Sequence, residues 1–153
     1  TSATDISTVH AIDTHAAGNS YVVLSNISTA AAALQEFGFT RMRNNPAEAL
    51  SPSDAAKTRN TGQSAYFPTS QGELFYYSIP TGGPLYLAYL RMAEESPDRA
   101  TAEYIKSLTG ASRVYLVINE YWHTFNKITP LAKLSADEWF PIDQGHALVF
   151  VYR

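Results

Sequence analysis

Two long apolar runs dominate the hydrophobic pattern of the chain and predict buried strands. One is "VYLVI", within residues 112–121, and the other is "ALVFVY", at residues 147–152 near the end of the sequence. Neither run alternates with polar residues, which is typical of strands covered on both faces of a sheet. We therefore expect the strand at 112–121 to be central.

Shorter extended segments precede these runs. Residues 20–26, "SYVVLSN", predict a strand because Tyr and Val favour a pleated surface. Residues 62–80, "GQSAYFPTSQGELFYYSIP", contain either two extended pieces bent near "TSQG" or one strand that leads into a short helix. The Ser/Thr-rich residues 1–19 predict an extended N-terminal segment with a short strand at "STVHAI".

The clearest helix is predicted at residues 27–39, "ISTAAAALQEFGF". Its alanines have high helix propensity, Ser28 or Thr29 can cap the start, and Gly38 is a typical stop signal. Residues 40–63 are rich in Pro, Asn and mixed charge, which indicates a long surface loop.

Two further helices are predicted after this loop. Pro84 suits the first position of a helix at 84–95, and Asp98 and Gly110 bound a helix at 98–109. The region 122–145 is expected to be irregular. The pattern therefore predicts an α+β fold: a single compact domain, 1–153, with a mixed, mainly antiparallel sheet and three helices.

Composition narrows the classes of function. The chain has 153 residues, 45% of them apolar and 16% charged, with a net charge of -3. This charge gives no basic face for nucleic acid, and the lack of cysteine excludes disulfides and thiolate chemistry. No apolar run approaches the ~20 residues that span a bilayer, so we expect a soluble chain without membrane insertion. Because the first residue is Thr and not Met, we expect a processed fragment or a module from a larger protein.

The histidines do not form a clear metal-binding pattern. His10 and His15 are five positions apart with Asp13 between them, whereas a metal pair needs spacing of two on a strand or four on a helix. His123 and His146 flank the two apolar strands and are expected to be satisfied surface residues. The sequence also lacks the motifs of a GxSxG hydrolase and of a phosphate-binding loop.

Glu120 is a candidate for chemistry because it follows the apolar run "VYLVI" and stands among Asn119, Tyr121 and Trp122. A carboxylate beside a buried strand is costly unless it is exposed, hydrogen-bonded or used in a reaction. It is either a solvent-facing residue at the rim of the sheet or a functional group.

Tyr66 and Tyr77 lie eleven positions apart around the polar segment "PTSQGE". They either cover a sheet, since Tyr is a favoured strand residue, or face one another as a slot for a planar heterocycle such as nicotinamide. The second arrangement requires the chain to fold back at "PTSQG".

The stretch "SAYFPTSQGELFYYS", followed by "VYLVINEY", resembles the ADP-ribosyltransferase fold of the diphtheria-toxin and poly-ADP-ribose-polymerase type. The resemblance implies NAD as a substrate, with Tyr66 and Tyr77 around its nicotinamide and Glu120 as the catalytic residue on the ribose. Ser25 stands where the family carries its NAD-anchoring His or Arg, and His10 or His15 is the alternative anchor.

The resemblance predicts an NAD-dependent ADP-ribosyltransferase-like toxin or effector module that modifies a protein target, or an NAD glycohydrolase, secreted or translocated into a target cell. The alternative is a non-enzymatic recognition module that binds a glycan or a protein through its Tyr and Trp residues. An RNase-type toxin is disfavoured by the acidic balance. The sequence leaves the oligomeric state open.

Overall fold

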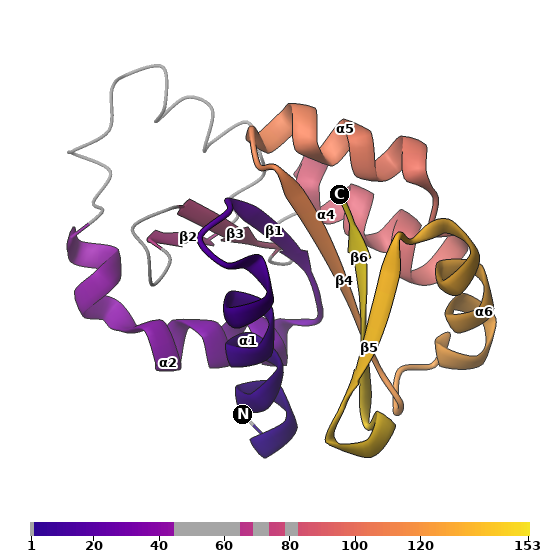
Figure 1. Ribbon diagram of the computed structural model, residues 1–153, viewed down its shortest axis with the longest axis horizontal. Coiled ribbons are helices and arrows are strands. Elements are labelled where there is room, and N and C mark those ends of the chain that lie inside the picture. The colour runs from indigo at the N-terminus through magenta and orange to yellow at the C-terminus, as the bar shows by residue number, and fades with distance from the viewer. Residues whose placement is uncertain (1, 45–64, 69–73, 79–82) are drawn as a thin grey trace.

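The computed structural model describes residues 2–44, 65–68, 74–78 and 83–153. Its centre is a six-stranded mixed sheet in the order β2-β3-β1-β4-β6-β5 (Figure 1). β1 runs parallel to both β3 and β4, and the other three pairs are antiparallel. The strands are β1 (Tyr21–Leu24), β2 (Ala65–Pro68), β3 (Leu74–Tyr77), β4 (Arg113–Asn119), β5 (Glu138–Ile142) and β6 (Ala147–Tyr152).

Helices cover both faces of this sheet, so the predicted α+β domain with a mainly antiparallel sheet is confirmed. The described part of the chain has five α-helices instead of the three predicted. They are α1 (Ala3–Ala16), α2 (Ile27–Asn44), α4 (Pro84–Leu90), α5 (Arg99–Thr109) and α6 (Phe125–Ser135). A π-helical segment, η2 (Arg91–Glu95), continues α4, and a short 3-10 turn, η3 (Asp143–Gly145), precedes β6.

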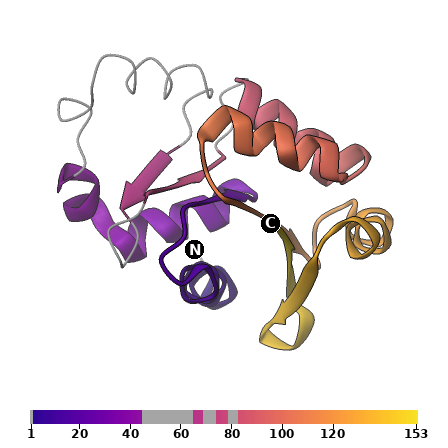
Figure 2. The same ribbon diagram turned by 45° about the horizontal axis from the view of Figure 1, so that its top comes forward.

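The strands separate two hydrophobic cores. On one face, α4, α5 and α6 pack against residues such as Leu24, Leu116 and Phe150. On the other face, α1 and α2 pack against residues such as Val23 and Val149 (Figure 2). Successive strand residues point to opposite faces, so burial on both sides explains the unbroken apolar runs of β4 and β6.

The extended segment predicted at residues 1–19 is wrong, because α1 occupies most of it. Ser2 caps this helix in a reciprocal capping box with Asp5. Several buried residues of α1 are polar, among them Asp5, Thr8 and Asp13, so the helix lacks a strong apolar stripe. The pattern of the sequence therefore concealed a helix that tertiary hydrogen bonds stabilise.

The irregular region predicted at 122–145 is also wrong, because α6 and β5 lie within it. Pro130 lies on the exposed side of α6, while Ile128 and Ala132 are fully buried in the core. α2 likewise continues past Gly38 to Asn44, so the loop predicted at 40–63 does not include its first five residues. Its remainder, residues 45–63, lies outside the described residues.

The other predicted elements are confirmed. β2 and β3 are two extended pieces that pair with Tyr66 opposite Tyr76, and β4 is a central strand. The α5 helix begins after the side-chain cap Asp98 and ends at Gly110, whose φ of 77° is left-handed. Among the described residues, none of the helices combines the length and apolar character needed to cross a bilayer.

Candidate functional site

The carboxyl ends of the parallel strands β1, β3 and β4 meet at one edge of the sheet. From this edge β1 leads into α2 on one face, whereas the next described helix after β3 is α4 on the opposite face. Connections that leave neighbouring strand ends toward opposite faces open a crevice, which is where ligands bind in many α/β sheets. We refer to this place as the carboxyl edge.

Ser25 and Ser78 form the floor of the carboxyl edge. The Ser78 hydroxyl accepts a hydrogen bond from the Ser25 amide at 3.3 Å and donates one to the Ser25 carbonyl at 3.3 Å. The Ser78 amide donates to the Val23 carbonyl at 3.1 Å, extending the β1–β3 ladder. Both serines are almost fully buried, so they hold the two strand ends together from within.

A pocket of about 160 Å³ opens above these serines, and aromatic side chains contribute to its lining. Tyr86 and Tyr89 come from one side of α4, with ring centroids 6.0 Å apart and planes tilted by 35°. Trp122 comes from the turn after β4, where its amide donates to the Asn119 carbonyl at 2.9 Å. The lining residues, which we call the edge pocket, are Ser25, Asn26, Ile27, Ser78, Tyr86, Tyr89, Leu90, Glu94 and Trp122.

The π-helical segment η2 forms the far wall of the edge pocket. Its widened turn is closed by the Ser96 amide, which donates to the Arg91 carbonyl five residues earlier at 2.9 Å. Leu90, just before the segment, and Glu94, within it, both line the pocket. Such π-bulges occur frequently at functional sites, because they change the direction of side chains along a helix.

Asn26 and Tyr121 close the rim with hydrogen bonds. Asn26 Oδ1 accepts from the Thr29 amide at 3.0 Å and so caps α2, while its Nδ2 donates to the Tyr121 hydroxyl at 2.8 Å. Asn119 Nδ2 donates to the same hydroxyl at 3.3 Å. The turn after β4 is thereby tied to the turn after β1.

Two buried polar atoms at this edge have no hydrogen-bond partner among the described residues. They are the indole nitrogen of Trp122, which lines the pocket, and Oδ1 of Asn119. An unpaired buried polar atom is costly and calls for an explanation, such as a ligand or an ordered water.

Tyr89 keeps its proton in this environment. Burial is the main cause that raises its pKa above the usual range, and Tyr86, Glu94 and Tyr121 add to the rise. The same neighbours show that rings and a carboxylate gather at this pocket. The Tyr89 hydroxyl is therefore neutral in this pocket.

Two of the predicted site residues meet at the carboxyl edge. Ser25 lines the edge pocket, and Glu120 follows β4 next to Tyr121. Glu120 is about half exposed, and its carboxylate hydrogen-bonds to His146 Nδ1 at 2.5 Å. Glu120 thus faces solvent and is paired with a histidine, and its catalytic role stays a prediction.

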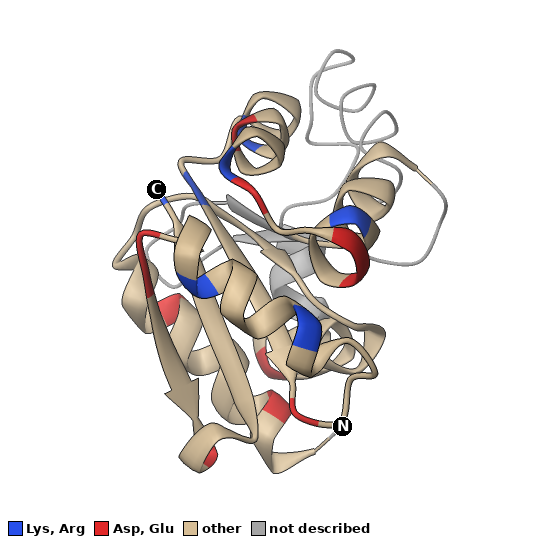
Figure 3. Ribbon diagram, turned by 90° about the vertical axis from the view of Figure 1, so that its right-hand side faces the viewer, with Lys and Arg blue, Asp and Glu red and all other residues tan. Residues whose placement is uncertain are grey.

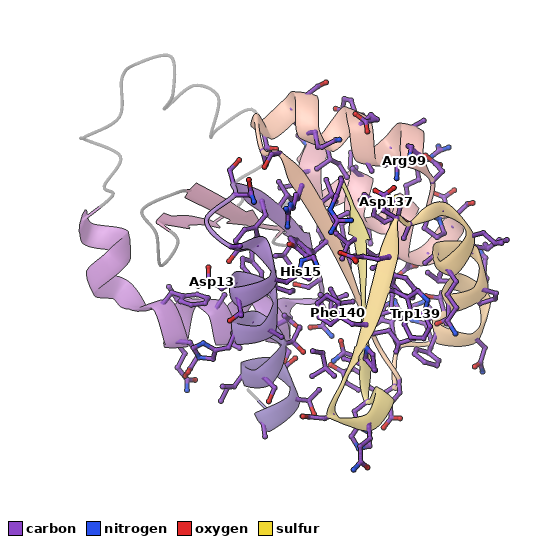
Figure 4. The ribbon with its side chains drawn as sticks, in the orientation of Figure 1. Asp13, His15, Arg99, Asp137, Trp139 and Phe140 are labelled. Atoms are coloured by element: carbon purple, nitrogen blue, oxygen red, sulfur yellow. The ribbon has the colours of Figure 1, made fainter. Side chains whose placement is uncertain are left out.

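His15 lies at the opposite end of the sheet, near the start of β4. Its ring nitrogens hydrogen-bond to the Tyr115 hydroxyl at 2.8 Å and to Glu138 at 2.7 Å, and its ring stacks on Phe140 at 5.2 Å (Figure 4). Arg113 donates to the His15 carbonyl at 3.1 Å. Both nitrogens have protein partners, and the structure does not bring His15 together with Ser25.

His10 pairs with Glu36 at 2.7 Å. In the described ranges, no three His, Cys, Asp or Glu residues cluster in a way that could hold a metal ion. His10 and His15 therefore have different partners in the fold: Glu36 for His10, and Tyr115 and Glu138 for His15.

Tyr77 is fully buried in the core under α1 and α2. Burial raises its pKa well above the usual range, and Asp13 adds to the rise. The side chain of its predicted partner, Tyr66, lies outside the described residues, although its backbone pairs with Tyr76. The nicotinamide slot between Tyr66 and Tyr77 therefore stays a prediction, and Tyr77 has no accessible surface in this arrangement.

The sequence offered only part of the signal for this site. Ser25 and the "NEYW" turn after β4 were visible, but Tyr86 and Tyr89 were hidden in a helix with ordinary apolar spacing. The π-helical turn that directs Glu94 had no sequence signature at all.

Comparisons of the chain with protein-family models, with curated proteins and with solved structures found no match.

Proposed function

We propose that the protein is a non-enzymatic recognition module whose ligand enters the edge pocket. The observation that supports this function is the convergence of Tyr86, Tyr89 and Trp122 with the small polar residues of two strand ends. Binding pockets combine apolar and aromatic walls with a few fixed polar groups, and Tyr and Trp provide contact area at low entropic cost.

The two serine hydroxyls of the pocket are engaged with the backbone. Ser78 donates to the Ser25 carbonyl, and Ser25 donates to the Asn26 carbonyl at 3.2 Å. A serine nucleophile needs an adjacent general base within hydrogen-bond reach. The hydrogen bonds of both hydroxyls are to backbone groups and not to such a base, which favours recognition over covalent catalysis.

Charge on the surface also favours a small ligand over nucleic acid. Figure 3 shows Lys and Arg interspersed with Asp and Glu on the side of the molecule that carries α6 and β5. Arg99, for example, is paired with Asp137 at 2.7 Å (Figure 4). Basic residues that are neutralised in this way do not form the continuous positive surface that nucleic acid requires.

NAD-dependent ADP-ribosyl transfer, with Glu120 as the catalytic residue, stays a prediction of the sequence resemblance. It expects NAD hydrolysis or modification of a target protein that is abolished by Glu120→Ala in a folded protein. Its geometric basis is the shared edge of Ser25 and Glu120, whereas Tyr77 is buried on the face opposite the edge pocket.

A titration of ¹⁵N-labelled protein decides between the two functions. Monosaccharides, nicotinamide, NAD and small ammonium compounds are added in turn, and amide and indole shifts are followed. A recognition module is expected to show saturable shifts at Ser25, Asn26 and the Trp122 indole, without NAD turnover. Trp122→Ala removes these shifts, while Trp139→Ala, which alters an exposed Trp on β5, is the matched control.

NAD hydrolysis that is lost in Glu120→Ala and kept in Trp122→Ala would overturn the recognition function. The same holds if no member of the panel shifts the pocket residues. Circular dichroism of each variant establishes that the fold is retained.

A further inference from the structure

We propose that the group bound in the edge pocket is a methylated ammonium ion carried by the ligand. This inference rests on the proposed function and specifies the chemistry that the same pocket recognises.

Three aromatic residues line the pocket. Tyr86, Tyr89 and Trp122 line one space of about 160 Å³, together with the aliphatic Ile27 and Leu90. At ~30 Å³ for each water of the liquid, this volume corresponds to roughly five waters, a space suited to one compact group. Quaternary ammonium groups are recognised by sets of aromatic rings because the electron-rich ring faces attract a cation.

Charge in the pocket matches a cation. Glu94 is the only acidic lining residue, and the lining contains no Lys or Arg. The Glu94 carboxylate lies 3.6 Å from the His123 imidazole, while Lys127 Nζ donates to the Glu94 backbone carbonyl at 2.8 Å and not to the carboxylate. The carboxylate is about one-third exposed and is thus accessible to a ligand cation.

The hydrogen-bonding groups favour methylated over unmethylated ammonium. A primary ammonium presents three N–H donors that need acceptors when they are buried. The Ser78 hydroxyl both donates to and accepts from the Ser25 backbone, and the rest of the lining is largely apolar. Few acceptors besides the Glu94 carboxylate therefore remain for three N–H donors. A trimethylammonium group donates no hydrogen bond, so it keeps its charge near Glu94 without leaving buried donors unpaired.

The unpaired indole nitrogen of Trp122 adds a requirement for an acceptor. It is a donor only, it is buried, and no described residue accepts from it. A hydroxyl, carbonyl or carboxylate oxygen a few bonds from the ammonium would satisfy it. We therefore expect choline or betaine to bind more tightly than tetramethylammonium.

Titration calorimetry and the ¹⁵N experiment test this chemistry with matched probes. Choline is compared with its neutral carbon isostere 3,3-dimethylbutan-1-ol, which has nearly the same shape and lacks the charge. Binding of choline is expected to be about tenfold tighter than that of the isostere, within the range of cation–π and charge contributions. A peptide with trimethyl-lysine, beside the same peptide with unmodified lysine, distinguishes a protein-borne group from a free small molecule.

Variants of single residues test which side chains of the edge pocket contribute to choline binding. Glu94→Gln should weaken choline binding about threefold to tenfold and leave the isostere unchanged, because it removes charge and keeps shape. Glu95→Gln, at the exposed neighbour outside the pocket lining, should change neither. Trp122→Phe keeps a ring in place and should weaken binding less than Trp122→Ala, so a folding defect in the alanine variant does not decide the outcome.

Equal affinity for choline and the isostere would overturn the inference. Saturable shifts of the pocket residues with a sugar or nicotinamide, and none with any ammonium probe, would overturn it as well and leave the recognition function standing. Absence of pocket shifts with every probe would defeat both.

Discussion

The Thr29 hydroxyl donates a hydrogen bond to the Asp5 carboxylate at 2.9 Å and so joins the first turn of α2 to the first turn of α1. Ser28 donates to the other carboxylate oxygen at 2.6 Å, and Ser2 completes the capping box of α1. One buried carboxylate therefore serves the N-termini of two helices, where negative charge is favoured by the helix dipoles.

Replacement of this carboxylate should destabilise the protein. Asp5→Asn keeps the volume but exchanges one charged acceptor oxygen for an amide donor, which faces the donors of Ser2 or Ser28. We expect the free energy of unfolding to fall by about 2 kcal/mol, since hydrogen bonds to buried charged groups are worth about 1.5–3 kcal/mol. Urea denaturation measures the loss, and Asp143→Asn, at an exposed aspartate, is the control with little expected change.

Acid should destabilise the protein through lowered carboxyl pKa values. Burial opposes ionisation of Asp5, but the hydrogen bonds from Ser28, Ser2 and Thr29 outweigh it and lower the pKa. Arg99 is the main cause that lowers the pKa of Asp137. At pH values between the folded and unfolded pKa, the unfolded chain binds more protons, so stability rises with pH there and is full above the unfolded value.

Urea denaturation between pH 2.5 and 7 tests this dependence. Stability should be constant with respect to these groups above pH ~5 and decline as the pH falls below ~4, through the folded pKa values. Asp5→Asn should have a flatter profile than the wild type in that acidic range. A profile with the same slope as the wild type would show that Asp5 does not contribute to the acid sensitivity.

The hydroxyl of the buried Tyr115 is expected to stabilise the fold through its hydrogen bond with His15. Tyr115→Phe leaves His15 Nδ1 without its 2.8 Å partner but keeps the ring that packs edge-on against His15. We expect a loss of about 1 kcal/mol in the free energy of unfolding and a change in the ¹⁵N shifts of the His15 ring. Tyr104→Phe, at a half-exposed ring, is the control, and an equal loss there would contradict the assigned role of the hydroxyl.

Local sequence signals predicted the elements that depend on short-range physics. Apolar runs found β4 and β6, and the Asp98 cap with Gly110 found α5, because burial on two faces and cap geometry leave marks in adjacent residues. The helix α1 was not predicted because the partners of its buried Asp5 include Thr29, which is distant in sequence. No local pattern records a hydrogen bond between two helices.

The site was less predictable than the fold for the same reason. Glu120 was found as a strand-end residue, since the carboxyl end of a strand has a recognisable position in sequence, and Ser25 was found only through the family resemblance. The aromatic walls come from α4, whose Tyr86 and Tyr89 look like ordinary helix residues until the sheet places them over Ser78. The predicted pairing of Tyr66 with Tyr77 rested on their spacing, the polar segment between them and the family resemblance, and none of these determines which face of the sheet a ring occupies.

Ser78 gives the sharpest test of the carboxyl edge because it supports the fold and lines the pocket. Ser78→Ala leaves the buried Ser25 amide without its hydroxyl acceptor and should lower the free energy of unfolding by about 1–3 kcal/mol. Ser25→Ala removes a hydroxyl that donates to the neighbouring Asn26 carbonyl, a local contact, and should cost less. Amide hydrogen exchange at Ser25 should accelerate in Ser78→Ala, since this hydroxyl is its acceptor. If both variants lose the same stability and Ser25 exchanges as in the wild type, the link between the β1 and β3 ends does not organise the pocket.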